Sequence, residues 1–291
     1  MMNTQPQPRS ERHAGRQSTA TRASPMQRVR HNQVEWIADR VSERDWQVLE
    51  TVNRLRLVSG NQLERLLFDA LHGHAREVVR GRVLRRLVRW QVLDALPRRV
   101  GGSARGSAGI VFALGTAGVR LVAERQAATT GRSRVRRPGI PTDRTVRHTL
   151  AVSELYTALV EQARSHGVTV LSFQAEPASW WPNGLGGYLK PDAYTLLMSG
   201  GVREHWWIEV DRATESLPTL KRKLTAYLDF VARGQLGPGH VVPRVLVSTI
   251  STARASAVQA LVDHLPLPAG DLFLTLPQRD AATALIHSLR E

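Results

Sequence analysis

Hydrophobic and polar residues in the first half of the chain alternate with the period of α-helices. Two segments, 42–59 and 59–68, each open with a serine that is followed three residues later by an Asp or Gln able to complete a helix capping box. A third helix is predicted over residues 74–91 because its apolar residues form a single stripe: Val79, Val83, Leu84, Leu87 and Val88. The pattern therefore predicts three consecutive helices.

A strand pair and a closing helix follow these three helices. Residues 91–100 and 110–115 read as two strands joined by the tip GGSARGSAG, and residues 116–125 read as a helix. Three helices followed by a basic hairpin is the order of a winged helix-turn-helix domain, which places its third helix in the major groove of DNA and its hairpin near phosphates. The alternative is a small helical domain with a solvated basic face. The arginines predicted to contact DNA are Arg76, Arg80, Arg82 and Arg86 in the helix and Arg98, Arg99 and Arg105 in the hairpin.

The second half of the chain combines strands of period 2 with longer helical segments. Two strands, 190–198 and 203–211, are joined by Ser-Gly-Gly, a strong signal for a β-hairpin. The core order αβββαβ predicts a mixed sheet flanked by helices, in an α/β (α+β) protein with a winged helix-turn-helix domain first. The remaining predicted elements are a helix over 144–165, a strand over 168–175, a helix over 217–233, a strand over 244–249, a helix over 252–265, a strand over 271–276 and a final helix.

Charge is distributed unevenly along the chain. Of the net charge of +15, residues 1–33 contribute +5 and residues 34–142 contribute +10, whereas residues 143–291 are neutral overall. An excess of positive charge confined to the first half of the chain is expected if that half binds a polyanion such as nucleic acid. A basic surface alone does not choose DNA over RNA, so RNA binding is an alternative. Composition and pattern predict a disordered basic tail over 1–33, a winged helix-turn-helix domain over 34–125, a linker over 126–142 and a second domain over 143–291.

The sequence shows no sign of secretion or membrane insertion. It contains no cysteine, no apolar run of about 20 residues, and no apolar segment behind its N-terminal arginines. These features exclude thiolate metal sites and favour the cytoplasm. Any metal ion would need carboxylate, histidine or water ligands.

The predicted hairpin brings carboxylates together. Folded at its central glycine pair, it places Asp192 opposite Glu209 and Lys190 opposite Asp211, while the period of 2 puts Glu209 and Asp211 on one face. Like charges on paired residues are destabilising. Mg²⁺, or Mn²⁺ in its place, would offset them, since such a cation prefers carboxylate oxygens and can orient a phosphodiester. The alternative is a solvated strand end with an Asp211–Lys190 ion pair.

Three other ionisable residues of the second half are interpreted as mainly structural. Glu176, after the first strand, is a further candidate ligand, although an acid in a turn before proline is common. Glu154 lies opposite the apolar stripe of its helix and is predicted to be solvated. His148 lies at the edge of that stripe and is predicted to be a hydrogen-bonded structural histidine rather than a catalytic one.

Several segments resemble a known family. The motif KPDAY followed by WIEVD, within the αβββαβ order, resembles the PD-(D/E)xK nuclease fold. Together with the helical first half and the segments RHTLAVSELY and LKRKLTAY, it resembles the replication-relaxation family of bacterial plasmids and other mobile elements, over about residues 40–235. The resemblance implies Mg²⁺ or Mn²⁺ held by Asp192 and Glu209, and catalysis by these two acids with Asp211 and Lys223. Asp211 stands where the nuclease pattern has a lysine, so Lys221 or, preferably, Lys223 would replace that lysine.

The resemblance also implies a role for the whole chain. It predicts a protein that binds double-stranded DNA, acts in replication or maintenance of a mobile element, and cleaves DNA with a metal ion. The competing prediction is a DNA-binding regulator without enzymatic activity, whose second domain is a degenerate nuclease that serves assembly. The partners this implies are double-stranded DNA, a second copy in a homodimer, and replication proteins of the element.

Overall fold

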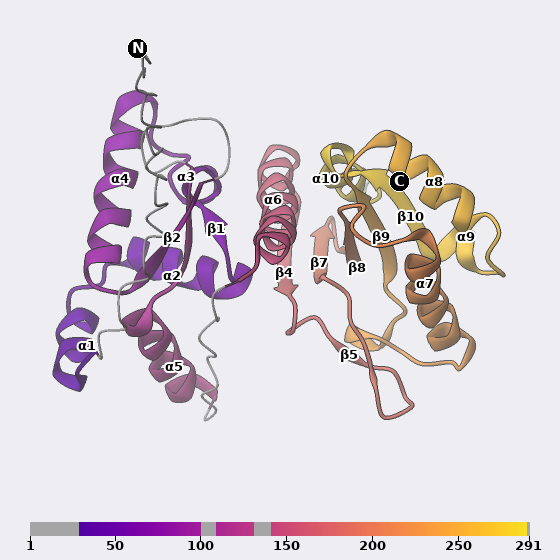
Figure 1. The fold of residues 1–291 in the computed structure, drawn as a ribbon, viewed down its shortest axis with the longest axis horizontal. Helices are drawn as coiled ribbons and strands as arrows, with labels where there is room; N and C mark the ends of the chain where they lie inside the picture. The colour runs from indigo at the N-terminus through magenta and orange to yellow at the C-terminus, as the bar shows by residue number, and fades with distance from the viewer. Residues whose placement is uncertain (1–28, 100–108, 131–140, 290–291) are drawn as a thin grey trace, which may run out of the picture.

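Two β-sheets of unequal size organise the chain, one in each half. The computed structural model describes residues 29–99, 109–130 and 141–289. The fold is mixed α/β, with a three-stranded sheet in the N-terminal half, residues 29–130, and a mixed five-stranded sheet in the C-terminal half, residues 141–289. Helix α6 (Asp143–His166) lies between the N-terminal half and the five-stranded sheet (Figure 1).

The N-terminal half contains the predicted succession of three helices, a hairpin and a closing helix. Both predicted capping boxes are present, with Ser42 and Asp45 at the start of α2 and Ser59 and Gln62 at the start of α3. Its sheet has the order β1-β3-β2, with both pairings antiparallel. The elements are α1 (His31–Ala38), α2 (Glu43–Leu55), β1 (Val58–Ser59), α3 (Gly60–Leu67), α4 (Gly73–Arg89), β2 (Leu93–Arg99), β3 (Ile110–Leu114) and α5 (Thr116–Thr130).

Two predicted boundaries of this half differ from the structure. Helix α1 begins at His31, inside the segment predicted as a disordered tail, and its only apolar positions facing the core are Val34 and Ile37, too few to give a periodic signal. Helix α5 continues to Thr130, five residues beyond the predicted helix end and into the segment predicted as a linker. The rest of the predicted tail, residues 1–28, and residues 131–140 of the predicted linker lie outside the described residues.

The C-terminal half contains the predicted αβββαβ order with a few short additions. The central sheet has the order β10-β9-β8-β7-β4, in which β4, β7 and β8 pair antiparallel whereas β8, β9 and β10 pair parallel. The helices are α6 (Asp143–His166), α7 (Leu217–Ala232), the 3-10 helix η1 (Pro238–His240), α8 (Thr252–Val262), α9 (Ala269–Leu272) and α10 (Gln278–His287). The strands are β4 (Thr169–Ala175), β5 (Trp181–Pro182), β6 (Tyr188–Leu189), β7 (Ala193–Ser199), β8 (Val202–Asp211), β9 (Arg244–Thr249) and β10 (Phe273–Pro277).

The register of the β7–β8 hairpin confirms the register predicted from its glycine pair. Ser199 pairs with Val202 and Ala193 with Ile208, so Asp192, one residue before β7, falls beside Glu209. The two turn glycines have positive φ, which glycine adopts without a steric penalty.

Alternation along β8 divides its side chains between the two faces of the sheet. Trp206 packs into the core on the side of α6 and α10, whereas Trp207 packs against α7 and α8. Because the side-chain period of a strand is 2, Glu209 and Asp211 lie on the Trp207 face, at the end of the strand. Helix α7 covers that face, so its side chains meet Glu209.

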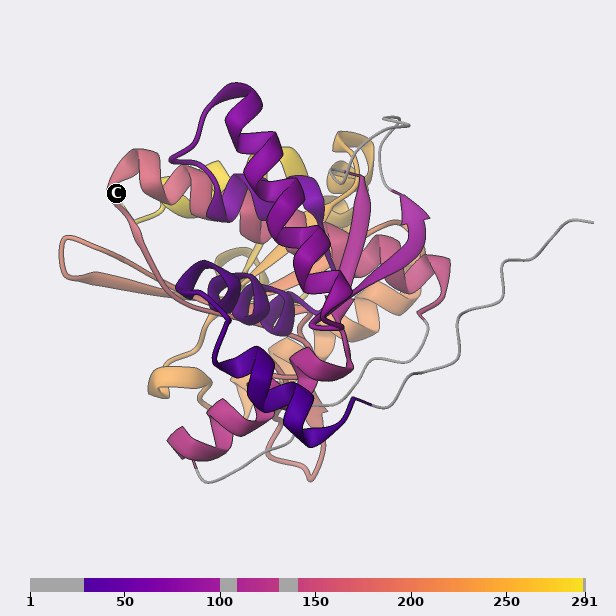
Figure 2. The same ribbon diagram turned by 90° about the vertical axis from the view of Figure 1, so that its left-hand side faces the viewer.

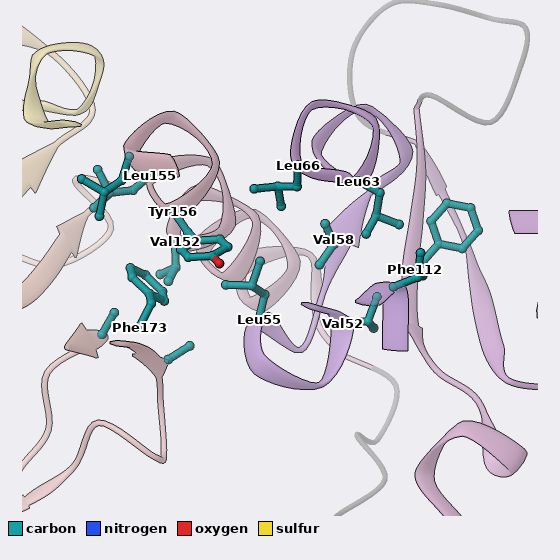
Figure 3. Close-up of a cluster of buried hydrophobic side chains, with 14 of the residues drawn as sticks. Val52, Leu55, Val58, Leu63, Leu66, Phe112, Val152, Leu155, Tyr156 and Phe173 are labelled. Carbon is teal, nitrogen blue, oxygen red and sulfur yellow. The ribbon is translucent and has the colours of Figure 1, made fainter. Parts of the chain in front are cut away.

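Helix α6 is the packing partner of both halves. On one side Leu55 and Leu66 of the N-terminal half approach it, and on the other Leu155 and Tyr156 of α6 lie towards the central sheet (Figure 3). These leucines are essentially buried, and burying such a side chain contributes about 1.5–3 kcal/mol. A single apolar cluster therefore continues from one half into the other.

Helix α4 lies on the outer side of the N-terminal half, away from the central sheet (Figure 1), whereas β3 of the β2–β3 hairpin packs Val111 and Ala113 against α6. Figure 2 shows this side facing the viewer, with α4 and the hairpin side by side. Across the described residues, no helix combines the length and hydrophobicity needed to cross a membrane.

Candidate functional site

A pocket of about 470 Å³ opens at the end of β8, between the first turns of α6 and α7. Its lining includes three buried acids, here called the acidic floor: Asp192, Glu209 and Asp211. Three arginines, here called the basic rim, line the same pocket from more accessible positions: Arg144, Arg147 and Arg212. Lys223, His148, Glu176 and Glu215 complete the ionisable lining. Buried ionisable groups gathered in a pocket are typical of a binding or catalytic site.

Glu209 is enclosed by side chains of α7. Its carboxylate accepts a 2.5 Å hydrogen bond from the Tyr227 hydroxyl on Oε1 and contacts the Lys223 ammonium through Oε2. Only 2% of the residue is exposed. Burial raises the pKa of Glu209 to about 7, because the charge of Lys223 and the hydrogen bonds offset only part of the cost of burying a carboxylate. The nearby charge of Asp192 raises it further.

Asp192 is held by groups that stabilise its charged form. His148 Nε2 lies 3.1 Å from Oδ1, and the backbone N–H of Val210 donates a 2.7 Å hydrogen bond to Oδ2. Burial alone would raise the pKa of Asp192, but His148, Lys223 and the Val210 N–H outweigh it and hold the pKa below its usual value. In turn the hydrogen bond to Asp192 raises the pKa of His148 despite its burial.

Lys223 is the lysine that the structure brings to the acidic floor. Its ammonium contacts Glu209, whereas Lys221 is exposed and does not line the pocket. Burial opposes the charged form, but Glu209 and Asp192 outweigh that effect and raise the pKa of Lys223. Tyr227, one turn along α7, donates to the same carboxylate, as its spacing of four residues allows. Burial, with the charge of Glu209, raises the pKa of Tyr227 well above its usual value.

Asp211 lines the pocket but is held by a different partner. Arg254 of α8 binds it through Nε at 2.5 Å. Lys190 instead lies over the Trp180 ring, 4.8 Å from its centroid, so the interpretation of an Asp211–Lys190 pair is wrong. Parallel pairing places Thr249 of β9 beside Asp211, and α8 begins three residues later, which brings Arg254 to the end of β8.

The acidic floor fits a site completed by water and substrate rather than a cage of protein ligands. No three His, Asp or Glu side chains are grouped to hold a metal ion anywhere in the part of the chain that the structure describes. The three acids of the floor therefore do not converge on one cation position. Mg²⁺ commonly binds one or two carboxylates plus waters and phosphate oxygens. Asp192 and Glu209, adjacent in the sheet and open to one pocket, fit that pattern.

Two acids interpreted from the sequence have partners in the N-terminal half. Glu176 lines the pocket and lies 3.4 Å from Arg56. Glu154 accepts hydrogen bonds from Arg65, at 2.6 Å, and from Gln62, at 3.0 Å. Glu154 is thus solvated in part, as 42% of its side chain is exposed, while it also binds α3 through Arg65.

His148, Tyr227 and Arg254 were not predicted as site residues. One sign in the sequence indicated that His148 could belong to the site: it lies at the edge of the apolar stripe of its helix. A side chain at that position can reach a neighbouring element. Tyr227 carried a weaker signal, since a residue four positions after Lys223 is its neighbour on one face of a helix. Nothing in local spacing marks Arg254, because its role depends on which strands pair in parallel.

The arginines predicted to contact DNA have different environments. Arg76 and Arg80 form ion pairs with Glu64 of α3, and Arg80 is buried. Arg86 binds the buried Asp45 at 2.7 Å, whereas Arg82 is exposed on α4. Arg105 and the side chains of Arg98 and Arg99 lie outside the described residues.

Fold and pocket together define the class: a mixed α/β protein in which a buried acid pair at a strand end meets a lysine and a histidine from flanking helices. The chain belongs to the replication-relaxation family, whose family model matches residues 49–245. That membership points to a role in replication or in the maintenance of mobile elements. No curated protein and no solved structure matches the chain.

Proposed function

We propose that the C-terminal half is a PD-(D/E)xK nuclease-like domain that cleaves DNA with a divalent metal ion. The contact between the Lys223 ammonium and the Glu209 carboxylate carries this proposal. It supplies a cation beside the acid pair even though Asp211 occupies the usual position of the motif lysine. A lysine from the following helix thus takes the place of the missing one.

Each residue has a distinct role in this proposal. Asp192 and Glu209 would hold Mg²⁺ or Mn²⁺, which when bound supplies charge neutralisation and lowers the pKa of a water molecule. The Lys223 ammonium stabilises the negative charge that develops on the phosphate oxygens. His148 fixes the orientation of the Asp192 carboxylate from α6. Tyr227 does the same for Glu209 from α7.

We propose further that the N-terminal half is a winged helix that binds double-stranded DNA. The order α2-β1-α3-α4 followed by the β2–β3 hairpin supports this, as does the positive charge of the half. Arg82, Arg85 and Arg89 are exposed at a spacing that puts them on one face of α4. In this proposal they contact the DNA, while Arg76, Arg80 and Arg86 hold α4 to α3 and α2.

One observation favours a second candidate, a DNA-binding regulator without cleavage. Asp211 is neutralised by Arg254 rather than left open to a metal ion, and it replaces the lysine of the motif. If Lys223 serves only to neutralise buried Glu209, the pocket is a stabilised remnant of a nuclease site.

A plasmid-nicking assay separates the two candidates. Purified wild-type protein and the Asp192→Ala variant are incubated with supercoiled plasmid in Mg²⁺, in Mn²⁺ and in EDTA. Metal-dependent nicking by the wild type that disappears in the variant supports the nuclease. Identical plasmid retardation by both proteins, with no nicking under any condition, supports the regulator.

A further inference from the structure

Two arginines of the basic rim, Arg147 and Arg212, differ from the arginines that stabilise the fold by binding carboxylates. Arg65, Arg80, Arg86 and Arg254 each bind a carboxylate at short range. Among the described residues, neither Arg147 nor Arg212 forms an ion pair or a side-chain hydrogen bond. A guanidinium without a partner at the mouth of an acidic pocket is available to an anionic ligand.

The third rim arginine is only loosely held. Arg144 lies 3.9 Å from Glu215, and both side chains are largely exposed, so this pair contributes little. The pocket therefore combines the buried acids of the floor with the arginines of the rim, and Glu176 and Glu215 line it as well. The acids of the floor are partly neutralised from within by Lys223, His148 and Arg254. Arg147 and Arg212 thus remain as pocket cations that no carboxylate in the described part of the chain neutralises.

The rim arginines reach the pocket from two elements. Arg147 lies in the second turn of α6, next to His148, whereas Arg212 follows directly after β8 and Asp211. The acid pair lines the same pocket. An extended polyanion crossing the pocket mouth can contact both arginines and leave its middle over Asp192 and Glu209.

We infer that Arg147 and Arg212 bind the two backbone phosphates that flank the phosphodiester presented to Asp192 and Glu209. This inference rests on the proposed function of the pocket and names the part of the substrate that the pocket recognises. Guanidinium groups match phosphate oxygens in charge and in paired hydrogen-bond geometry. Backbone phosphates carry no sequence information, so recognition at this pocket is independent of base sequence.

The test measures binding under conditions in which cleavage is not required. The full-length Arg147→Ala/Arg212→Ala variant is compared with wild type by fluorescence anisotropy of a short labelled single-stranded DNA, in Ca²⁺. A single strand does not offer the duplex major groove that α4 is proposed to read. The matched control is Arg203→Ala/Arg222→Ala, which removes the same charge from exposed positions of the same half that do not line the pocket.

The rim variant is expected to bind the strand about tenfold more weakly than the control variant. The slope of log affinity against log salt concentration should fall by roughly 1.4, since each lost phosphate contact on a single strand removes about 0.7. Equal affinity and slope for the two variants would overturn the inference. Failure of the wild type to bind the strand would overturn it as well.

Cleavage assays then separate this inference from the proposed nuclease function. If the wild type cleaves, the rim variant should show a raised KM with a smaller change in kcat, because the arginines position the strand. If the wild type does not cleave but the rim variant still loses binding relative to the control, the nuclease proposal fails and the phosphate site stands.

Discussion

Glu209 and Lys223 form the most consequential pair of residues in the protein. The carboxylate is enclosed, the ammonium reaches the pocket, and each alters the pKa of the other. Burying such a pair is costly unless further hydrogen bonds satisfy it, and here Tyr227 supplies one. Two roles remain open for Lys223: neutralising Glu209, or acting on a phosphate as well.

Substitution of Lys223 distinguishes these two roles. Lys223→Met is expected to reduce cleavage about 10²- to 10³-fold, the usual effect of removing a preorganised group that stabilises transition-state charge. Lys221→Met, two residues earlier and exposed, should leave the rate unchanged. Initial rates of plasmid nicking at saturating Mg²⁺ provide the measurement. Equal rates for the two variants would show that Lys223 only stabilises the fold.

A pH effect on stability is expected from His205 on β8. Its ring lies 2.8 Å from the Tyr194 hydroxyl, and burial lowers its pKa despite an opposing backbone hydrogen bond at Pro238; the charge of Arg203 adds a smaller lowering effect. A histidine whose pKa is lowered by folding stabilises the protein above the unfolded value of about 6.5, and this stabilisation is lost as the pH falls below it.

The measurement is urea unfolding of wild type and His205→Gln at about pH 8 and about pH 5.5. The free energy of unfolding of the wild type should fall more between these two pH values than that of the variant, because only the wild type has this histidine to protonate on unfolding. His264→Gln, at an exposed position in the turn after α8, is the control and should follow the wild type. A parallel fall in wild type and His205→Gln would contradict the assignment.

At the scale of elements, α6 contributes side chains both to the pocket and to the contact with the N-terminal half. Near its start it presents Arg147 and His148 to the pocket, and further along it presents Glu154 and Glu161 to the N-terminal half. Arg65 of α3 binds both acids, and its hydrogen bonds to Glu161 and Glu154 raise its pKa despite partial burial. Because His148 lies on the same helix, the contacts of Arg65 also help to fix the position of His148 relative to the N-terminal half.

Arg65→Met tests this connection. The substitution keeps an aliphatic side chain but leaves two half-exposed carboxylates without their cation, so we expect a loss of about 1–3 kcal/mol in the free energy of unfolding. Arg82→Met on the exposed face of α4 should change it by less than about 0.5 kcal/mol. Urea titrations of the two variants give the comparison, and indistinguishable midpoints would show that the halves do not depend on this bridge.

Elements with strong local signals could be predicted from the sequence. Strand β9 has the predicted bounds 244–249, and the β7–β8 register followed from two turn glycines. Short elements such as β5, β6 and α9 contain too few residues to establish a period. Contacts between distant elements were predicted least well, because local spacing does not report which strands lie side by side. Arg254 is the clearest case, since its carboxylate partner lies 43 residues earlier.

At the scale of the whole molecule, the two proposed DNA-contacting surfaces do not coincide. The outer side of α4 faces away from α6, whereas the pocket lies in the half beyond α6 (Figure 1). A straight duplex held along α4 would therefore not lie over Asp192 and Glu209. Binding of duplex by the N-terminal half and handling of a strand by the pocket should be separable by substitution.

The variant Arg82→Ala/Arg85→Ala/Arg89→Ala tests that separation. Its duplex affinity should show a salt slope reduced by roughly 2.7, since each phosphate contact to B-DNA accounts for about 0.9. A control that removes three exposed arginines of the other half, Arg203, Arg222 and Arg279, should keep the wild-type slope. Binding of a short single strand in Ca²⁺ should change little in the α4 variant, because that strand is held by the basic rim. If duplex and single-strand affinities fall together in the α4 variant, one continuous surface binds both, and the division of labour between the two halves is wrong.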